Sequence, residues 1–358
     1  MANIEQTTKE KWKMTLKQYM RELWLMDRQY GQEEELYPLV NMLLREGVNT
    51  ENLSIRDVHL GKTDNDGRKF IKGYVGFPDL VILGEEFENN EEYTNVNYLF
   101  GCVETKISKD VKSNGKQKLK ELNQFLEGDG KRKITCKKED NNYILLGEES
   151  SDHYHITCND KLWDLGQLLG EFLWYGKVLY TNGLVWKYIK VTECRCKENK
   201  INNIQELRKD FFENCNEIYT GKCEEIQNSE QYNQIPGLGK EVESLIKKEE
   251  FKNLKEDEQK KAIYKAIENV VKKILWLEFL VQKFKENDFT IEIEKETIGD
   301  LTNIYNEITS EEGRKANNSK KLFENLTEED YRAWDDFKSK LAHINWQERV
   351  LDSNEQKE

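Results

Sequence analysis

Two short apolar segments, FPDLVIL at residues 77–83 and YLFGCVETKI at residues 98–107, decide the fold of this 358-residue chain. Both segments are apolar on both faces apart from Asp79, Glu104 and Lys106. Strands of this kind are typical of a central sheet that is covered by helices on its two sides. The proline of the first segment stands near its start, where a strand tolerates the missing N–H. The two segments therefore predict strands of a buried central sheet.

Regular elements on both sides of these segments complete an α/β pattern. Apolar residues at helical spacing predict helices at residues 7–29, 32–46, 113–126 and 161–176. Alternating or apolar runs predict further strands at residues 53–60, 69–75, 178–181 and 184–191. Asn182-Gly183 between the last two strands is a strong hairpin signal, and a polar insertion before the last helix is expected to hold another hairpin. We therefore expect a mixed central sheet flanked by helices, within a domain over residues 1–195.

The composition changes near residue 196, which marks the expected domain boundary. Residues 196–358 are rich in Lys, Glu and Asn, and they predict an all-helical domain with a DNA-binding or dimerisation role. Within residues 258–286, apolar side chains repeat at alternating spacings of four and three, at Ile263, Ile267, Val270, Ile274, Leu277, Val281 and Phe284. Such a heptad seam is typical of a long core helix or of a coiled-coil contact, so a homodimer through this helix is one of two open interpretations.

Composition and charge restrict the class of protein. Lys plus Arg is 55 and Asp plus Glu is 68, a net charge of −13, which excludes a uniformly basic nucleic-acid coat but not a local basic face. No apolar run approaches the roughly 20 residues of a membrane-spanning helix, and the N-terminus lacks the apolar core of a signal peptide. Seven cysteines, an odd number, indicate reduced thiols. These features predict a cytoplasmic protein without membrane contact.

The three ionisable residues of the apolar segments suggest a site for chemistry. Because side chains alternate across a strand, Glu104 and Lys106 project from the same side. If the two strands are neighbours, Asp79 meets Glu104 there, and the two carboxylates repel each other and lose hydration. A divalent cation relieves this repulsion, and Mg²⁺ prefers carboxylate and water oxygens. A metal ion, two carboxylates and a lysine suit phosphodiester hydrolysis.

The Pro-Asp on one strand and the Glu-x-Lys at the end of the next resemble the PD-(D/E)xK superfamily of restriction-endonuclease-like nucleases. The resemblance extends over about residues 30–190, where the order of predicted helices and strands is similar. It implies that Asp79, Glu104 and the backbone carbonyl of Thr105 bind Mg²⁺, which Mn²⁺ can replace, and that Lys106 assists the attacking water. The plainer alternative is an aspartate in a turn and a surface salt bridge from Glu104.

The same resemblance implies two further positions. Many members carry a glutamate on the helix before the sheet, which here matches Glu33-Glu34-Glu35. We favour Glu35 as a catalytic residue and metal ligand, with Glu34 second, and the alternative is a solvated helix start. Many members also carry a glutamine on the helix after the lysine strand, here Gln167, although Glu171 stands where the family often has an aromatic residue. An exposed glutamine on an amphipathic helix is the alternative.

A basic stretch begins at Lys106. Residues 106–138 hold eleven basic and four acidic residues, so the local charge is 11 − 4 = +7. Lys109, Lys112 and Lys116, together with Gln167, are candidates for nucleic-acid binding, which would then depend on salt. A solvated lysine-rich helix is the alternative.

The sequence therefore predicts a Mg²⁺-dependent endonuclease that hydrolyses phosphodiester bonds, and the resemblance implies that its substrate is DNA, with duplex DNA favoured as the partner. Restriction or another defence against foreign DNA is the expected role. The alternatives are a repair, recombination or mobile-element nuclease of the same fold, and a catalytically inactive DNA-binding or assembly protein.

Overall fold

The structure of the chain is a computed structural model, which describes most of residues 13–348. The residues inside this range that it does not describe are 30–32, 49–51, 59–70, 72, 75, 89–96, 107–121, 140–141, 148–152, 158–163, 197–200, 230–231, 233–237, 286–288, 311–322 and 325.

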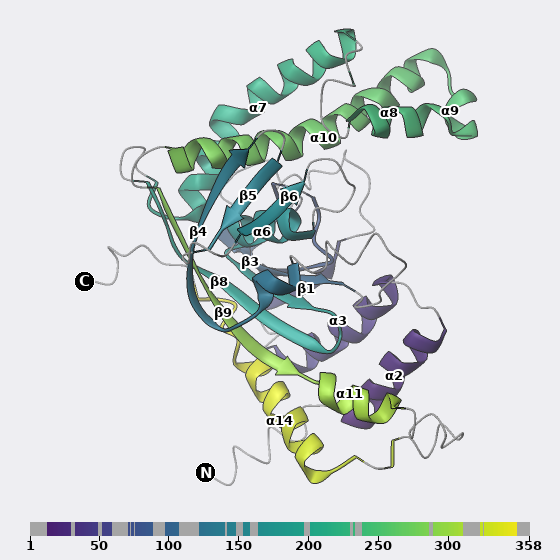
Figure 1. The fold of residues 1–358 in the computed structure, drawn as a ribbon, viewed down its shortest axis with the longest axis vertical. Coiled ribbons are helices and arrows are strands. Elements are labelled where there is room, and N and C mark those ends of the chain that lie inside the picture. Colours follow the sequence, from purple (N-terminus) through teal and green to yellow (C-terminus); the bar gives the residue numbers. More distant parts are fainter. Residues whose placement is uncertain are drawn as a thin grey trace.

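Nine strands among the described residues form one sheet in the order β1-β2-β3-β7-β8-β9-β4-β5-β6 (Figure 1). Their bounds are β1 Leu53–Asp57, β2 Leu80–Gly84, β3 Leu99–Thr105, β4 Gly130–Glu139, β5 Asn142–Leu146, β6 His153–Thr157, β7 Lys177–Thr181, β8 Val185–Arg195 and β9 Thr290–Asp300. β3 and β7 run parallel, whereas the other neighbouring pairs are antiparallel. The sheet is therefore mixed, as the sequence predicts.

Helices pack on both faces of this sheet, as Figure 1 shows. Their bounds are α2 Leu16–Arg28, the 3-10 turn η1 Glu33–Glu35, α3 Leu36–Gly47, α6 Asp164–Tyr175, α7 Ile204–Ser229, α8 Leu238–Ile246, α9 Glu249–Lys252, α10 Glu256–Lys285, α11 Thr302–Thr309 and α14 Glu328–His343. α6, α7 and α10 share one apolar core with the sheet, and α2, α3 and α14 share the other. None of the described helices is both long and apolar enough to cross a membrane.

The two cores explain why β2 and β3 are apolar on both faces. Val81 and Cys102 lie in the core beneath α6, whereas Leu80 and Val103 lie in the core beneath α3, and all four are fully buried. Burial of each such side chain stabilises the fold by about 1.5–3 kcal/mol. These two strands therefore lie between the two cores, and the polar residues at their ends are buried as well.

The hairpin predicted at Asn182-Gly183 joins β7 to β8. The Asn182 side-chain oxygen accepts hydrogen bonds from the N–H groups of Leu184 and Val185, at 3.0 and 2.8 Å. Gly183 has a φ of +87°, which favours glycine, and its carbonyl accepts a 2.6 Å hydrogen bond from the Tyr19 hydroxyl of α2. The turn therefore connects the sheet to the N-terminal helix.

The expectation of an all-helical segment over residues 196–358 is wrong at β9. This strand has the sequence TIEIEKETIGD, in which Ile291 and Ile293 are buried while Glu294 is exposed. Such alternation with a period of two favours a strand. β9 pairs with both β8 and β4, so the C-terminal half supplies an internal strand of the same sheet.

One of the predicted elements before β4 also differs from the structure. A strand was expected at residues 69–75, but the described residues there, including Ile71, Gly73 and Tyr74, form a helical position and a turn. Ile71 and Tyr74 are buried three residues apart, and Gly73 has a φ of +62°, which an extended strand does not adopt. Of the helix expected at residues 113–126, the structure describes only 122–126, which is helical.

The long helix predicted at residues 258–286 is confirmed as α10. Leu277 and Val281 of its heptad seam lie in the core beneath α6, and Ile267 lies in a smaller core that α10 forms with α7 and α8. Because Ile267 and Leu277 are fully buried within the chain, the interpretation as a core helix is confirmed. The buried residues of the seam are not free for a partner helix, and a homodimer stays a prediction.

Candidate functional site

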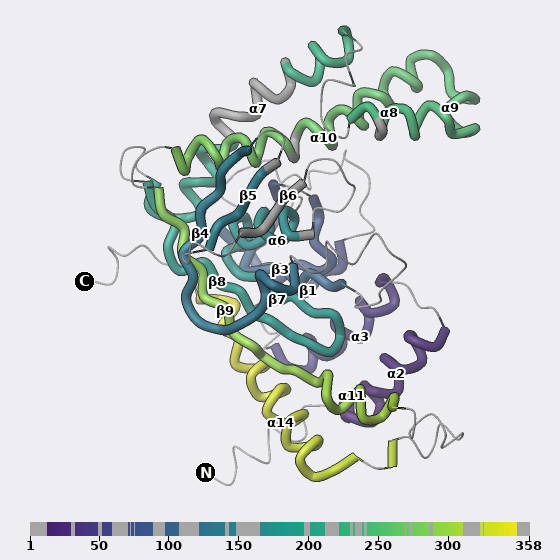
Figure 2. Tube along the Cα trace, in the orientation of Figure 1, coloured from purple at the N-terminus to yellow at the C-terminus, as the bar shows by residue number. Residues whose placement is uncertain are grey.

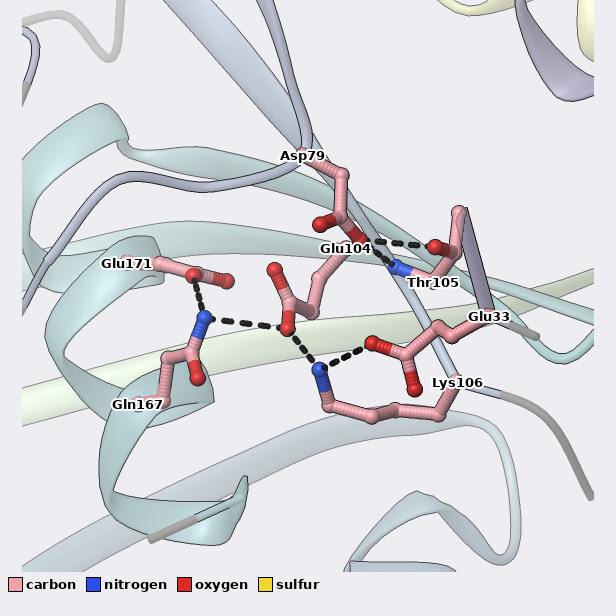
Figure 3. Close-up of polar contacts among 7 residues, drawn as sticks. All are labelled: Glu33, Asp79, Glu104, Thr105, Lys106, Gln167 and Glu171. Carbon is pink, nitrogen blue, oxygen red and sulfur yellow. Dashed lines mark hydrogen bonds and ion pairs between the residues drawn. The ribbon is translucent and has the colours of Figure 1, made fainter. Parts of the chain in front are cut away.

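The ends of β2 and β3 bring Asp79, Glu104 and Lys106 together (Figure 3). The two strands are antiparallel neighbours, with Leu80 opposite Val103, so the assumption behind the predicted site is confirmed. Glu104 and Lys106 project from the same side, and the Lys106 ammonium donates a hydrogen bond to Oε1 of Glu104. The apolar strands thus converge on a small polar cluster.

Asp79 is held in place by the next strand and by α3. Its Oδ2 atom accepts hydrogen bonds from the N–H and the hydroxyl of Thr105, both at 2.7 Å. Asp79 is 7% exposed and Thr105 is fully buried. Burial, together with the charge and the hydrogen bond of Asp79, raises the pKa of the Tyr37 hydroxyl above its usual value. The Asp79 carboxylate therefore has a fixed orientation before any ligand binds.

Helix α6 adds Gln167 and Glu171 to the cluster. Nε2 of Gln167 donates to Oε1 of Glu104 at 3.0 Å and to Oε1 of Glu171 at 2.9 Å. Glu104 and Glu171 are each 2% exposed, and the Oε2 atom of each has no hydrogen-bond partner. Figure 3 shows the two carboxylates pointing toward one another, with the Gln167 amide beside them. Gln167 thus lies in the predicted site, where it contacts acidic side chains.

Burial and like charges make it costly to ionise both glutamates. Burial and the charge of Glu171 raise the pKa of Glu104 well above its usual value, against the opposing effect of Lys106. Burial raises the pKa of Glu171 to about 7, although Gln167 and Lys106 act in the opposite direction. Burial lowers the pKa of Lys106, but the charges of Glu104 and Glu33 outweigh it and raise this pKa well above its usual value. The site therefore contains a protonated lysine and an excess of carboxyl groups.

Glu33, in place of the favoured Glu35, is the glutamate that reaches the site. Oε1 of Glu33 lies 3.3 Å from Nζ of Lys106. Helix α3 starts only at Leu36, and the buried residues Leu36, Tyr37 and Val40 lie three, four and seven positions after Glu33. Those spacings put Glu33 on the buried side of the helix. Glu34 and Glu35 are exposed, so the preference for Glu35, with Glu34 second, is corrected to Glu33.

The basic stretch at residues 106–138 was expected to lie beside the site, but the part of it on β4 lies elsewhere. Lys109, Lys112 and Lys116 lie outside the described residues. Residues 130–138 lie on β4, which is separated from β3 by β7, β8 and β9. Lys137 and Lys138 form ion pairs with Glu139 and Glu278, and Lys131 lies opposite Glu294 in the sheet register. The described end of this stretch is therefore a charged sheet surface away from the carboxylates.

The donor set of the site fits a hard divalent cation. Carboxylate oxygens are the ligands that Mg²⁺ prefers, and Oε2 of Glu104 is a buried oxygen without a hydrogen-bond partner. Among the described residues, no three His, Cys, Asp or Glu side chains form a ready-made metal cage. An ion that draws carboxylates from separate elements together when it binds, and that is completed by water, agrees with both observations.

Comparisons with known proteins give no indication of the function of this chain. The chain matches no protein-family model, no curated protein and no solved structure. The assignment of function therefore depends on the residues described above.

Sequence reasoning missed Glu33 and Glu171. Glu33 could have been found from the helical spacing to Leu36, if the start of the helix had been known. Glu171 interrupts the apolar sequence LLGEFLWY of α6, and an acidic residue in such a helix is a signal of a buried polar site.

Proposed function

We propose that the chain is a divalent-metal-dependent nuclease of the PD-(D/E)xK type. The observation that carries this proposal is the convergence of Asp79, Glu104 and Lys106 at the ends of two neighbouring buried strands. Glu33 and Gln167, at the two helix positions where members of that family carry site residues, lie in contact with the same cluster and support it. A surface salt bridge does not account for Glu104, because this side chain is 2% exposed.

Each residue of the cluster has a role in this proposal. Asp79 and Glu104, with the backbone carbonyl of Thr105, hold Mg²⁺ or Mn²⁺. When bound, the cation activates water for attack and neutralises negative charge on the phosphate. Thr105 orients Asp79 through its N–H and hydroxyl. Lys106, protonated and held between Glu104 and Glu33, orients the water and stabilises the charge that develops on the phosphate.

We further propose duplex DNA as the substrate and defence against foreign DNA as the role. Both follow from the resemblance to restriction-endonuclease-like nucleases. A repair or recombination nuclease would use the same site, so these roles are separated by substrate preference, not by the cluster itself.

Cleavage of supercoiled plasmid in Mg²⁺ or Mn²⁺ tests the proposal. Asp79→Asn keeps an acceptor for Thr105 but removes the charge, and Lys106→Met removes the ammonium. Each is expected to lower the cleavage rate by at least about a hundredfold. Glu243→Gln, at an exposed position of α8, is the matched control and should cut like the wild type.

Two outcomes contradict the proposal. If the wild type binds DNA but cuts it with neither cation, the chain is a binding protein. If Asp79→Asn and Lys106→Met cut at the wild-type rate, a nuclease activity resides elsewhere in the chain.

A further inference from the structure

Glu171 is a buried carboxylate to which the proposed nuclease mechanism assigns no role. It lies on α6 among Leu168, Leu169 and Phe172, which are buried, and it is itself 2% exposed. Acidic side chains are almost never this deeply buried unless they are paired or bind a metal ion. Its Oε1 atom accepts a hydrogen bond from Gln167, whereas its Oε2 atom has no partner.

The Gln167 amide holds Glu171 and Glu104 as a pair. One nitrogen donates to Oε1 of Glu171 at 2.9 Å and to Oε1 of Glu104 at 3.0 Å. An amide nitrogen carries two hydrogens, so both are used in these two contacts. No other side chain donates to the Oε2 atom of either glutamate, and the two carboxyl groups, which Figure 3 shows pointing toward one another, bond each other only when a proton lies between them. The chain thus presents two fixed oxygens, from two different elements, to which no other side chain donates a hydrogen bond.

The charge around this pair is strongly acidic. The residues drawn in Figure 3 include four acidic side chains, Asp79, Glu104, Glu171 and Glu33, and a single ammonium, that of Lys106, which contacts Glu104 and Glu33. Lys106 contacts the Oε1 atom of Glu104, so it leaves the Oε2 atoms uncompensated. A divalent cation supplies the missing positive charge and prefers oxygen ligands of this kind.

We propose that Glu104 and Glu171 together bind the divalent cation through their Oε2 atoms, with Gln167 as a positioning residue. This inference rests on the proposed nuclease function and names the residue that completes its metal site. Two carboxylates with several waters is a common way for proteins to hold Mg²⁺. The family that the chain resembles often has an aromatic residue at this position, so the ligand from α6 is a feature of this chain.

Metal binding without DNA tests this inference directly. Isothermal titration with Mn²⁺, repeated with Mg²⁺, measures the dissociation constant of the full-length chain. Glu171→Gln keeps the size of the side chain and an acceptor for Gln167, and we expect it to raise the Mn²⁺ dissociation constant at least tenfold. Gln167→Ala, which frees both carboxylates, should raise it by about ten- to a hundredfold. Glu243→Gln serves as the control and should bind Mn²⁺ like the wild type.

A second measurement needs no variant, in case Glu171→Gln does not fold. Fe²⁺ placed in a Mg²⁺ site with ascorbate and peroxide cleaves the nearby backbone, and mass spectrometry locates the cuts. We expect cuts at the end of β3 and within α6 near residues 167–171. Cuts at β2 and β3 but not at α6 would overturn the inference.

The two proposals fail in different ways. If Glu171→Gln binds Mn²⁺ within twofold of the wild type while Asp79→Asn does not bind it, the α6 ligand is wrong and the nuclease proposal stands. If Glu171→Gln weakens Mn²⁺ binding but the wild type cuts no DNA, the metal site stands and the nuclease proposal falls.

Discussion

Individual hydrogen bonds fix the geometry of the acidic cluster before any metal or substrate arrives. Thr105 donates twice to Oδ2 of Asp79, and Gln167 donates once to each of Glu104 and Glu171. Because these contacts are buried, removing one partner leaves a charged group without compensation. At this scale the site is preorganised by neutral donors more than by ion pairs.

Thr105→Val tests the contribution of the hydroxyl that orients Asp79. It keeps the shape of the side chain but removes a hydrogen bond to a buried charged group, so the free energy of unfolding should fall by about 1.5–3 kcal/mol. Thr309→Val is the control, because the Thr309 hydroxyl donates to a neutral acceptor, the carbonyl of Tyr305, at 2.9 Å. Urea denaturation should show a clearly smaller loss for the control, and equal losses would contradict the assigned role of Thr105.

Glu171 predicts a pH dependence of stability in the metal-free protein. Its pKa is raised from 4.5 to about 7 in the folded state, so between these values the folded chain binds more protons than the unfolded chain. Its stabilising contribution is present below pH 4.5 and is lost as the pH rises through 7. In EDTA, the free energy of unfolding of Glu171→Gln should therefore rise relative to that of the wild type between pH 5 and pH 8. The raised pKa implies a gain of a few kcal/mol. Parallel pH profiles of the two proteins would disprove this.

Among the elements, α10 connects two apolar cores of the molecule. Its C-terminal half lies in the core beneath α6, and its N-terminal half lies in the smaller core with α7 and α8. In Figure 1, α7, α8, α9 and α10 gather at one end of the molecule. The heptad seam of α10 therefore stabilises the single chain.

Leu277→Ala measures how much the heptad seam of α10 stabilises the single chain. The residue is fully buried, and truncation should lower the free energy of unfolding by about 2–5 kcal/mol. Light scattering should give the same molar mass for the variant and the wild type, since the seam makes its contacts within the chain. Leu254→Ala, 38% exposed just before α10, is the control, with a loss of about 0.5 kcal/mol or less. A dissociated oligomer would instead place Leu277 in an interface between chains.

The sequence predicted the elements whose patterns are local. β2 and β3 were predictable because both faces are apolar, and the alternation in β3 placed Glu104 and Lys106 together. β9 was missed because its strand period lies in a segment whose Lys- and Glu-rich composition favours helix. The interruption of an apolar helix by Glu171 is a local signal of a buried polar site, but its contact with Glu104 depends on the packing of α6 against β3, which no local pattern encodes.

In the whole molecule, the segment that follows α14 packs against β3, inside the sheet. α14 lies close to the N-terminal helices (Figure 2). The rings of Trp334 on α14 and Tyr19 on α2 are 5.1 Å apart. Beyond α14, the ring of Trp346 covers Gly101 of β3, and the Lys177 ammonium donates to the carbonyls of Asn345 and Trp346, at 3.0 and 2.9 Å. Chain ends that are far apart in sequence thus support the strand that carries the site.

Trp346→Ala tests this support. The ring is buried against Gly101, and its loss should lower the free energy of unfolding by about 3–5 kcal/mol. Tyr331→Ala, an aromatic truncation on α14 at a side chain that is 43% exposed, is the control and should have little effect. Thermal denaturation of both variants checks the difference, and comparable losses would show that the C-terminal segment is not an integral part of the core.

The most direct test of the central claim is the rate of DNA cleavage by Glu104→Gln. This variant keeps the volume of the side chain but removes the charge shared by the proposed metal site and Lys106. Our account predicts that wild-type cleavage requires Mg²⁺ or Mn²⁺ and stops in EDTA, and that Glu104→Gln still binds DNA while cutting it at least about a hundred times more slowly. Cleavage by Glu104→Gln at the wild-type rate would contradict it.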